Sequence, residues 1–223
     1  MCGTCGCGHD HEVVTLEQKV LAKNDDLAAA NRAWLAERRI RTVNLMSSPG
    51  AGKTTLLERT IRDAGDARPV AVVEGDQETR LDAERIRRTG CPVVQVNTGA
   101  GCHLDAAMLR TALDRLDPAD GCLLFVENVG NLVCPALFDL GEDAKAVIFS
   151  VTEGTDKPLK YPYMFAAADL IVVNKLDLLP YVDFDLDACR EHVASVNPKA
   201  EVVAVSATRG DNLGSWYDWL AIS

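Results

Sequence analysis

The chain has 223 residues, of which 48% are hydrophobic, 25% charged and 5% aromatic, a composition that favours one folded domain and excludes a disordered or collagen-like chain. Acidic residues outnumber basic ones by 33 to 23, and the net charge of −10 argues against nonspecific binding to nucleic acid. The sequence has no apolar run near the roughly 20 residues that cross a bilayer and no signal-peptide core at its start, so we expect a cytoplasmic protein that binds no membrane.

The first twelve residues are rich in cysteine, glycine and histidine and offer little for a core to bury, so we interpret them as a flexible tail. Cysteines rarely form disulfides in a reducing compartment, and the clustered Cys2, Cys5 and Cys7 therefore indicate a metal site. Three thiolates with a backbone nitrogen or the terminal amine suit square-planar Ni²⁺. A tetrahedral Zn²⁺ site that adds His9 or His11 is the rival interpretation.

Residues 15–39 contain no glycine or proline and carry apolar side chains at helical spacing, which predicts an amphipathic helix. The heptad positions are Val20, Leu27 and Trp34. Thr15 with Gln18 three residues later resembles a capping box and places the start of the helix. This apolar stripe can pack on the main domain or against a second copy of the chain, and we favour the main domain.

After the helix, apolar runs of strand length alternate with helical segments. Continuous β-branched runs suit strands that are buried on both faces, so we expect an α/β fold with a mostly parallel seven-stranded sheet flanked by helices. The runs span residues 42–46, 69–75, 92–96, 122–127, 146–152, 170–174 and 201–206. The chain is therefore expected to divide into a tail (1–12), an N-terminal helix (13–40) and a single domain (41–223). Ligands of such folds bind at the carboxyl ends of the strands.

The first strand is followed by SSPGAGKTT and a helical pattern, an arrangement typical of a P-loop that wraps phosphates with backbone N–H groups. Lys53 is expected to reach the β- and γ-phosphates, and the Thr54 hydroxyl to ligate Mg²⁺. Ser47 departs from the usual pattern, which begins with glycine. The residues expected to hold the phosphates are Gly50, Ala51, Gly52, Lys53, Thr54 and Thr55.

Two further motifs follow later strands and favour a guanine base. Asn174, Lys175 and Asp177 belong to an N-K-x-D motif directly after the run LIVVN, and Ser206 and Ala207 open a SAT loop after the last run. A carboxylate at Asp177 accepts from the paired N–H donors of guanine, whereas adenine would leave its charge unpaired. The combination predicts that the nucleotide is GTP rather than ATP.

Carboxylates at strand ends are expected to complete the magnesium site and to assist hydrolysis. Asp76 and Glu127 each follow an apolar run, Glu74 competes for the same role, and Gly130 can approach a γ-phosphate through its N–H. Lys53 and Mg²⁺ would stabilise the phosphoryl oxygens. Asp76 and Glu127 are both candidates to orient the attacking water, and a partner subunit can supply further charge.

A second metal site is predicted within the domain. Cys102 and His103 follow the third strand, and Cys134 lies shortly after Glu127, on the segment expected to shift with the nucleotide. Thiolate and imidazole ligands accept both Zn²⁺ and Ni²⁺. A buried cysteine is often only a small apolar side chain, and we assign that role to Cys91, Cys122 and Cys189.

The chain contains, in this order, MCGTCGCG, SSPGAGKTT, VEGDQET, NTGAGCHLD, ENVGNLVCP, TEGTDKPLKYP, NKLDLLPY and SAT. Over essentially its full length it closely resembles the HypB family of hydrogenase nickel incorporation GTPases. The resemblance implies a G domain of the SIMIBI class of P-loop GTPases that dimerises with GTP and helps to deliver nickel to the large-subunit precursor of [NiFe]-hydrogenase. It also implies a HypA-type nickel metallochaperone as a partner.

The resemblance also implies ligand roles. The family's interfacial nickel and zinc ligands fall on Cys102, His103 and Cys134, and its high-affinity nickel motif falls on Cys2, Cys5 and Cys7. Many members carry a long histidine-rich stretch after this motif, whereas only two histidines stand here before the helix, so bulk nickel storage is not expected. The role of Lys157 in DKPLKYP is left open.

Two alternative functions are also compatible with the sequence. One is a nickel buffer whose GTPase activity is weak, and the other is a related GTPase that serves urease maturation. The MCGTCGCG tail and the sequence around Cys134 weigh against the second alternative.

Overall fold

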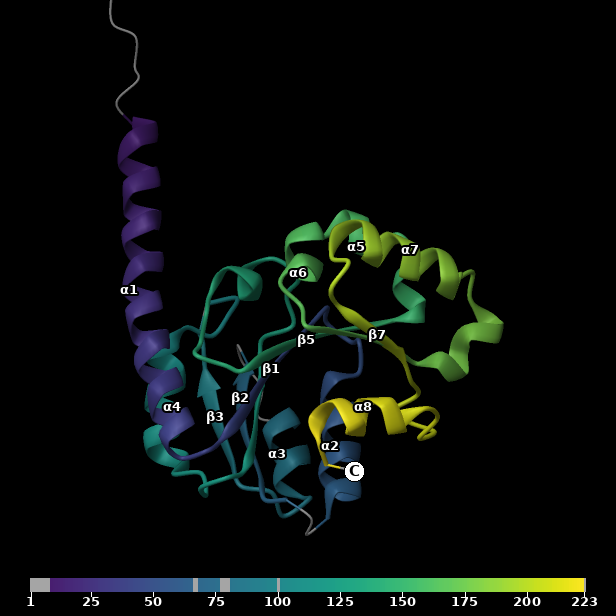
Figure 1. Ribbon diagram of the computed structural model, residues 1–223, viewed down its shortest axis with the longest axis horizontal. Helices are drawn as coiled ribbons and strands as arrows, with labels where there is room; N and C mark the ends of the chain where they lie inside the picture. The colour runs from purple at the N-terminus through teal and green to yellow at the C-terminus, as the bar shows by residue number, and fades with distance from the viewer. Residues whose placement is uncertain (1–8, 66–67, 77–80, 100, 223) are drawn as a thin grey trace, which may run out of the picture.

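The computed structural model describes residues 9–65, 68–76, 81–99 and 101–222, with side chains from residue 19 onward. Seven strands form one sheet in which every neighbouring pair is parallel, in the order β3-β2-β4-β1-β5-β6-β7 (Figure 1). The strands are β1 (Arg41–Ser47), β2 (Val70–Asp76), β3 (Val93–Asn97), β4 (Leu123–Glu127), β5 (Ala144–Ser150), β6 (Leu170–Asn174) and β7 (Glu201–Ala204). The predicted α/β class is confirmed, and each strand overlaps one of the predicted apolar runs.

Helices flank the sheet on both faces. The α-helices are α1 (His9–Glu37), α2 (Lys53–Ala64), α3 (Leu81–Arg87), α4 (Ala106–Leu116), α5 (Lys157–Lys160), α6 (Pro162–Ala166), α7 (Leu186–Val196) and α8 (Leu213–Leu220). The 3₁₀-helices are η1 (Cys134–Leu137), η2 (Val151–Glu153) and η3 (Leu176–Tyr181). Within the described part of the chain, none of these helices is both long and apolar enough to cross a bilayer.

Successive strand residues point to opposite faces of the sheet, and each face packs on its own helices. Phe125 of β4 lies in a cluster with α2, α3 and α8, where Trp216 is fully buried. Its neighbour Val126 faces α4 and the C-terminal part of α1. Farther along the sheet, Phe149 of β5 packs against α6 and α7. Because both faces are covered, the strands are continuous apolar runs rather than alternating ones.

Helix α1 begins at His9 rather than at Thr15, where the capping-box pattern placed its start. No glycine or proline lies between residues 9 and 39, so nothing in the sequence stops the helix from extending into the predicted tail. The C-terminal half of α1 lies beside α4, and its N-terminal half extends past the sheet (Figure 1).

The face of α1 that packs on the domain is more polar than the heptad pattern predicts. Val20 is 51% exposed, and Leu27 and Trp34 are only half-buried. The fully buried positions are Asn24, Ala28, Asn31 and Leu35. The helix does pack on the main domain, but two asparagines occupy its buried seam.

Candidate functional site

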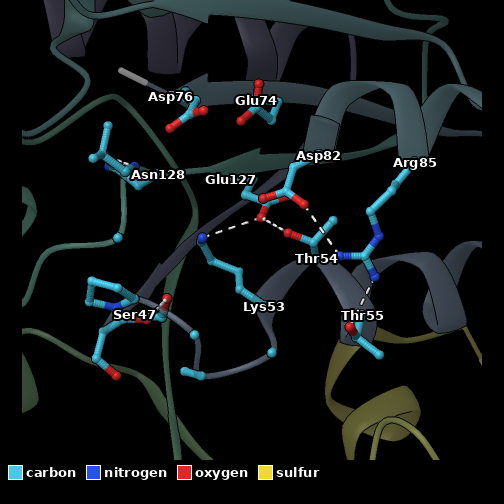
Figure 2. Close-up of a pocket in the computed structure, with 18 of the residues that line it drawn as sticks. Ser47, Lys53, Thr54, Thr55, Glu74, Asp76, Asp82, Arg85, Glu127 and Asn128 are labelled. Carbon is cyan, nitrogen blue, oxygen red and sulfur yellow. Dashed lines mark hydrogen bonds and ion pairs between the residues drawn. The ribbon is translucent and has the colours of Figure 1, made fainter. Parts of the chain in front are cut away.

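All seven strands are parallel, so their carboxyl ends meet at one edge of the sheet, and a pocket of about 590 Å³ opens there beside β1, β2 and β4 (Figure 2). The loop that follows β1 leads directly into the first residue of α2, Lys53. The six predicted phosphate-binding residues all line the pocket: Gly50, Ala51, Gly52, Lys53, Thr54 and Thr55. The N-terminus of α2 therefore points its free N–H groups at the space where a phosphate would lie.

Asn174 joins the P-loop to the two loops predicted to recognise the base. Its side chain is 2% exposed, donates to the carbonyl of Ala51 at 2.9 Å and accepts from the N–H of Ala207 at 3.1 Å. Gly52 has a φ of +92°, and a Cβ placed there would lie 2.5 Å from Asn174 Nδ2. Glycine is thus required at this position both by backbone conformation and by space.

The neighbouring residues of the N-K-x-D motif are fixed in the same way. Lys175 adopts a left-handed conformation with φ of +61°, and its ammonium donates to the carbonyl of Gly50 at 2.7 Å. Asp177 Oδ1 accepts from the Ser206 hydroxyl at 2.5 Å. The structure therefore brings the N-K-x-D and SAT motifs together beside the P-loop, with Lys175 among the residues that line the pocket.

Glu127, at the end of β4, connects the two side chains that begin α2. Its Oε1 accepts from the Thr54 hydroxyl at 2.6 Å and lies 3.2 Å from Lys53 Nζ (Figure 2). Glu127 is 1% exposed, so this carboxylate is held in place almost out of contact with solvent. Thr54, Lys53 and Glu127 thus form one charged cluster at the phosphate end of the pocket.

Glu74 lies opposite Glu127 in the sheet register and also lines the pocket. Burial, reinforced by the negative charges of Glu127 and Asp76, raises the pKa of Glu74 to about 8. The Oε2 atoms of Glu74 and Glu127 are both buried without a hydrogen-bond partner. Unpaired buried carboxylate oxygens beside a P-loop threonine are the donor set that Mg²⁺ prefers, so these residues fit a magnesium ion. Asp76 and Gly130 line the same pocket.

Several residues that contact the P-loop belong to no motif recognised in the sequence. Arg85 of α3 donates to the Thr55 hydroxyl at 3.0 Å and to Glu58 at 2.6 Å. On the other side, the Ser48 hydroxyl donates to Glu153. The same Glu153 carboxylate lies 3.1 Å from Lys157 Nζ. Lys157 therefore forms an ion pair that contacts the P-loop through Ser48.

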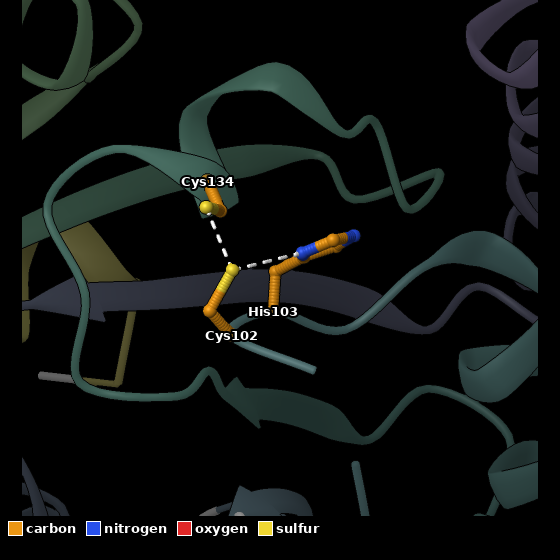
Figure 3. A group of neighbouring side chains, drawn as sticks. All are labelled: Cys102, His103 and Cys134. Atoms are coloured by element: carbon orange, nitrogen blue, oxygen red, sulfur yellow. Dashed lines mark hydrogen bonds between the residues drawn. The ribbon is translucent and has the colours of Figure 1, made fainter. Parts of the chain in front are cut away.

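Cys102, His103 and Cys134 lie together, as predicted from their positions after β3 and β4 (Figure 3). Their ligand atoms all lie within 4.8 Å of one another, and both thiols are free. Cys102 Sγ is 2.7 Å from Cys134 Sγ and 3.6 Å from His103 Nδ1. Two thiols and an imidazole at this spacing can hold one Ni²⁺ or Zn²⁺ ion.

The surroundings of the cluster affect its protonation. The hydrogen bond with Cys102, together with burial, raises the pKa of the Cys134 thiol. Burial lowers the pKa of His103, which favours the neutral imidazole that binds metals. The His103 ring stacks on Phe138 with 3.9 Å between centroids. The His103 imidazole is therefore held by Phe138, which lies outside the motifs recognised in the sequence.

Asn128 connects the metal cluster to the nucleotide pocket. It directly follows Glu127, is 1% exposed, and accepts at Oδ1 from the N–H of Leu104, the residue after His103. Its amide group donates to Asn44 of β1 at 3.3 Å. One buried side chain thus contacts the strand that leads into the P-loop and the loop that carries Cys102 and His103.

The three other described cysteines have the buried positions expected of small apolar side chains. Cys91, Cys122 and Cys189 are buried, and burial raises the pKa of Cys91 to about 12 and of Cys189 to about 11. These thiols pack as small apolar side chains. The predicted tail ligands Cys2, Cys5 and Cys7 lie outside the described residues.

An all-parallel sheet with a P-loop after β1 and the N-K-x-D and SAT loops after β6 and β7 defines the fold of a P-loop GTPase. Residues 41–204 match the family model described as CobW/HypB/UreG, nucleotide-binding domain. Within that family, the chain belongs to the HypB hydrogenase maturation factors.

Individual relatives agree with this assignment. The hydrogenase maturation factor HypB of Azotobacter vinelandii is 59% identical over 93% of this chain and 69% of its own length. The crystal structure of HypB from Archaeoglobus fulgidus has a TM-score of 0.84 at 40% identity, covering 90% of this chain and 98% of that one. HypB from Helicobacter pylori, solved in complex with nickel, also has a TM-score of 0.84, at 37% identity over 89% of this chain and 94% of that one.

Proposed function

We propose that this chain is a GTP-hydrolysing nickel metallochaperone that assists nickel insertion during [NiFe]-hydrogenase maturation. The observation that carries the proposal is the hydrogen bond of Asn128, the residue directly after Glu127, with Leu104, the residue directly after Cys102 and His103. A nucleotide that moves Glu127 would thereby alter the metal ligands. The nickel in the Helicobacter pylori relative supports the choice of metal.

Hydrolysis in this proposal depends on positioning and on charge. Lys53, now paired with Glu127, would turn to the β- and γ-phosphates when GTP binds, and Thr54 and Glu127 would hold Mg²⁺ directly or through water. When bound, Mg²⁺ supplies positive charge to the phosphate oxygens. Asp76 or Glu127 would orient the attacking water, and the N–H of Gly130 would contact the γ-phosphate. Asp177, supported by Ser206, would select guanine.

Nickel is the cargo in this scheme. Cys102, His103 and Cys134 would bind it with three ligands, and a second copy of the chain in a GTP-dependent homodimer would complete the coordination. Zn²⁺ competes for the same donors. The tail thiols of Cys2, Cys5 and Cys7 would form a separate nickel site. A HypA-type metallochaperone and the hydrogenase large-subunit precursor would be the partners in the cytoplasm.

The test measures sedimentation mass and metal content of the full-length protein with GDP and with a nonhydrolysable GTP analogue, with nickel and zinc supplied separately. The GTP analogue should produce a dimer and change the nickel affinity of the domain site. In a variant with Cys2, Cys5 and Cys7 replaced by serine, the tightest nickel binding should disappear while GTP turnover stays nearly unchanged. Cys134→Ser should remove the nucleotide-dependent part of nickel binding.

Nickel affinity that is the same in both nucleotide states would contradict the proposed coupling. A failure to hydrolyse GTP, with nickel binding intact, would instead favour the alternative of a nickel buffer. The intact set of Lys53, Thr54, Asn174 and Asp177 argues against that alternative, because a buffer has no need of these residues.

A further inference from the structure

Two buried asparagines of α1 bind the backbone of two other segments. Asn24 donates to the carbonyl of Asp139 at 2.7 Å and accepts from the N–H of Ala106 at 2.9 Å. Asn31, farther along the same helix, donates to the carbonyls of Ala106 at 2.9 Å and Leu140 at 3.0 Å. The asparagines are 6% and 1% exposed, so water does not compete for these bonds.

The two segments held by these bonds are the ones that carry the metal ligands. Ala106 opens α4, directly after the loop that contains Cys102 and His103. Asp139 and Leu140 directly follow Phe138, the ring that stacks on His103, and η1 with Cys134 lies just before it. Helix α1 therefore binds both ligand-bearing segments, through hydrogen bonds between its asparagine side chains and their backbone.

Polar residues on this seam have a physical consequence that apolar ones would lack. A hydrogen bond restricts the distance between its donor and acceptor to a range of a few tenths of an ångström, whereas apolar contacts let two surfaces slide past each other. Gly141 allows α1 to approach this closely, because a Cβ there would lie 2.5 Å from the carbonyl of Ala28. The four bonds therefore fix the separation between the loop of Cys102 and the segment of Cys134.

We propose that Asn24 and Asn31 are positioning residues for the metal site: they hold the two ligand-bearing segments at the spacing that one ion requires. The inference rests on the proposed metal binding at Cys102, His103 and Cys134.

The test uses the full chain with Cys2, Cys5 and Cys7 replaced by serine, so that only the domain site binds metal. Asn31→Asp keeps the side-chain shape but cannot donate to either carbonyl. We expect it to weaken Ni²⁺ binding roughly 10-fold, the effect typical of lost support behind metal ligands, in competition with a chromophoric chelator. The thiolate-to-metal charge-transfer bands of the Ni²⁺ and Co²⁺ forms should shift as well.

Two variants make this result specific. Asn24→Asp keeps the acceptor for the N–H of Ala106 and loses only the bond to Asp139, so its loss of affinity should be smaller than that of Asn31→Asp. Arg38→Ala is the control, because Arg38 lies just beyond the end of α1 and pairs with Asp117 and Asp120 away from the cluster. Its Ni²⁺ affinity and spectra should match the parent.

The inference would be overturned if both asparagine variants had the same Ni²⁺ affinity and the same spectra as Arg38→Ala. GDP binding reports whether each variant is folded, and if Asn31→Asp fails to fold, Asn24→Asp decides by the same criteria. If Cys102→Ser and Cys134→Ser leave Ni²⁺ binding of the parent unchanged, it is the proposed metal site that fails, and the outcome is distinguishable from a failure of the asparagine contacts.

Discussion

Glu74 is the residue whose environment departs most clearly from the behaviour of a free side chain. Its pKa is raised to about 8 from an ordinary value of 4.5, with burial as the main cause. Between these two values the folded chain holds a proton that the unfolded chain releases, so the contribution of Glu74 to stability is greatest below pH 4.5 and is lost as the pH rises toward 8. The charged form is tolerated at higher pH at the expense of stability.

Glu74→Gln should therefore reduce this pH dependence. In urea unfolding with EDTA and without nucleotide, the parent should lose stability from pH 5 to pH 8 by at most about 1.4 kcal/mol per pH unit, and the variant by less. Glu201→Gln, at an exposed strand position, is the control for removing a carboxylate and should keep the slope of the parent. Parallel curves for parent and Glu74→Gln would show that Glu74 is charged throughout this range.

Asp177 leads to a prediction about base choice. Asp177→Asn should weaken GTP binding by roughly 10- to 100-fold, because an amide at this position cannot accept from both donors of guanine, and should improve binding of xanthosine triphosphate. The Ser206 hydroxyl can still donate to the amide oxygen, so the loops should stay in place. Fluorescent-nucleotide titration measures both affinities, with exposed Asp183→Asn as the control. An unchanged GTP affinity in Asp177→Asn would refute the base-specificity argument.

At the scale of elements, the contact between α1 and the Asp139–Glu142 turn makes Gly141 irreplaceable. It has a φ of +91°, and an added Cβ would meet backbone atoms of Ala28 and Arg32 at 2.5 and 2.8 Å. Gly141→Ala should lower the free energy of unfolding by roughly 1–3 kcal/mol more than Gly90→Ala, because overpacking adds to the backbone strain. Gly90 has a similar φ of +85° and open space around it, so it isolates the backbone contribution. Urea unfolding of both variants provides the measurement, and equal losses would mean that α1 moves aside freely.

The seven strands and their order along the chain were predictable because each strand is a contiguous apolar run buried on both faces. The limits of α1 were not. Its start depends on how far a helix without glycine or proline extends, and its buried seam depends on the surface it meets. Val20 fits the heptad pattern but is 51% exposed, whereas Asn31 breaks the pattern and is buried.

At the scale of the whole molecule, an acidic chain can hold a polyphosphate because the positive potential is local. The net charge is −10, yet the N-terminus of α2 and Lys53 face the pocket. The parallel sheet also brings the carboxyl ends of β1, β2 and β4, and Lys175 directly after β6, to one edge of the sheet. The cluster of Cys102, His103 and Cys134 lies beside this edge, close enough for Asn128 to bind the residue after His103.

The sequence by itself determined the fold class, the family and the residues of the P-loop, N-K-x-D and SAT motifs, because each is a contiguous pattern with its own local chemistry. The grouping of Cys102, His103 and Cys134 was implied by the resemblance, and the structure brings them together although β2 lies between β3 and β4 in the sheet. Only the tertiary structure decided which side chains support these groups. Asn24, Asn31 and Glu153 lie about 75 to 115 positions from the partners they bind, and nothing in their local sequence specifies so distant a contact.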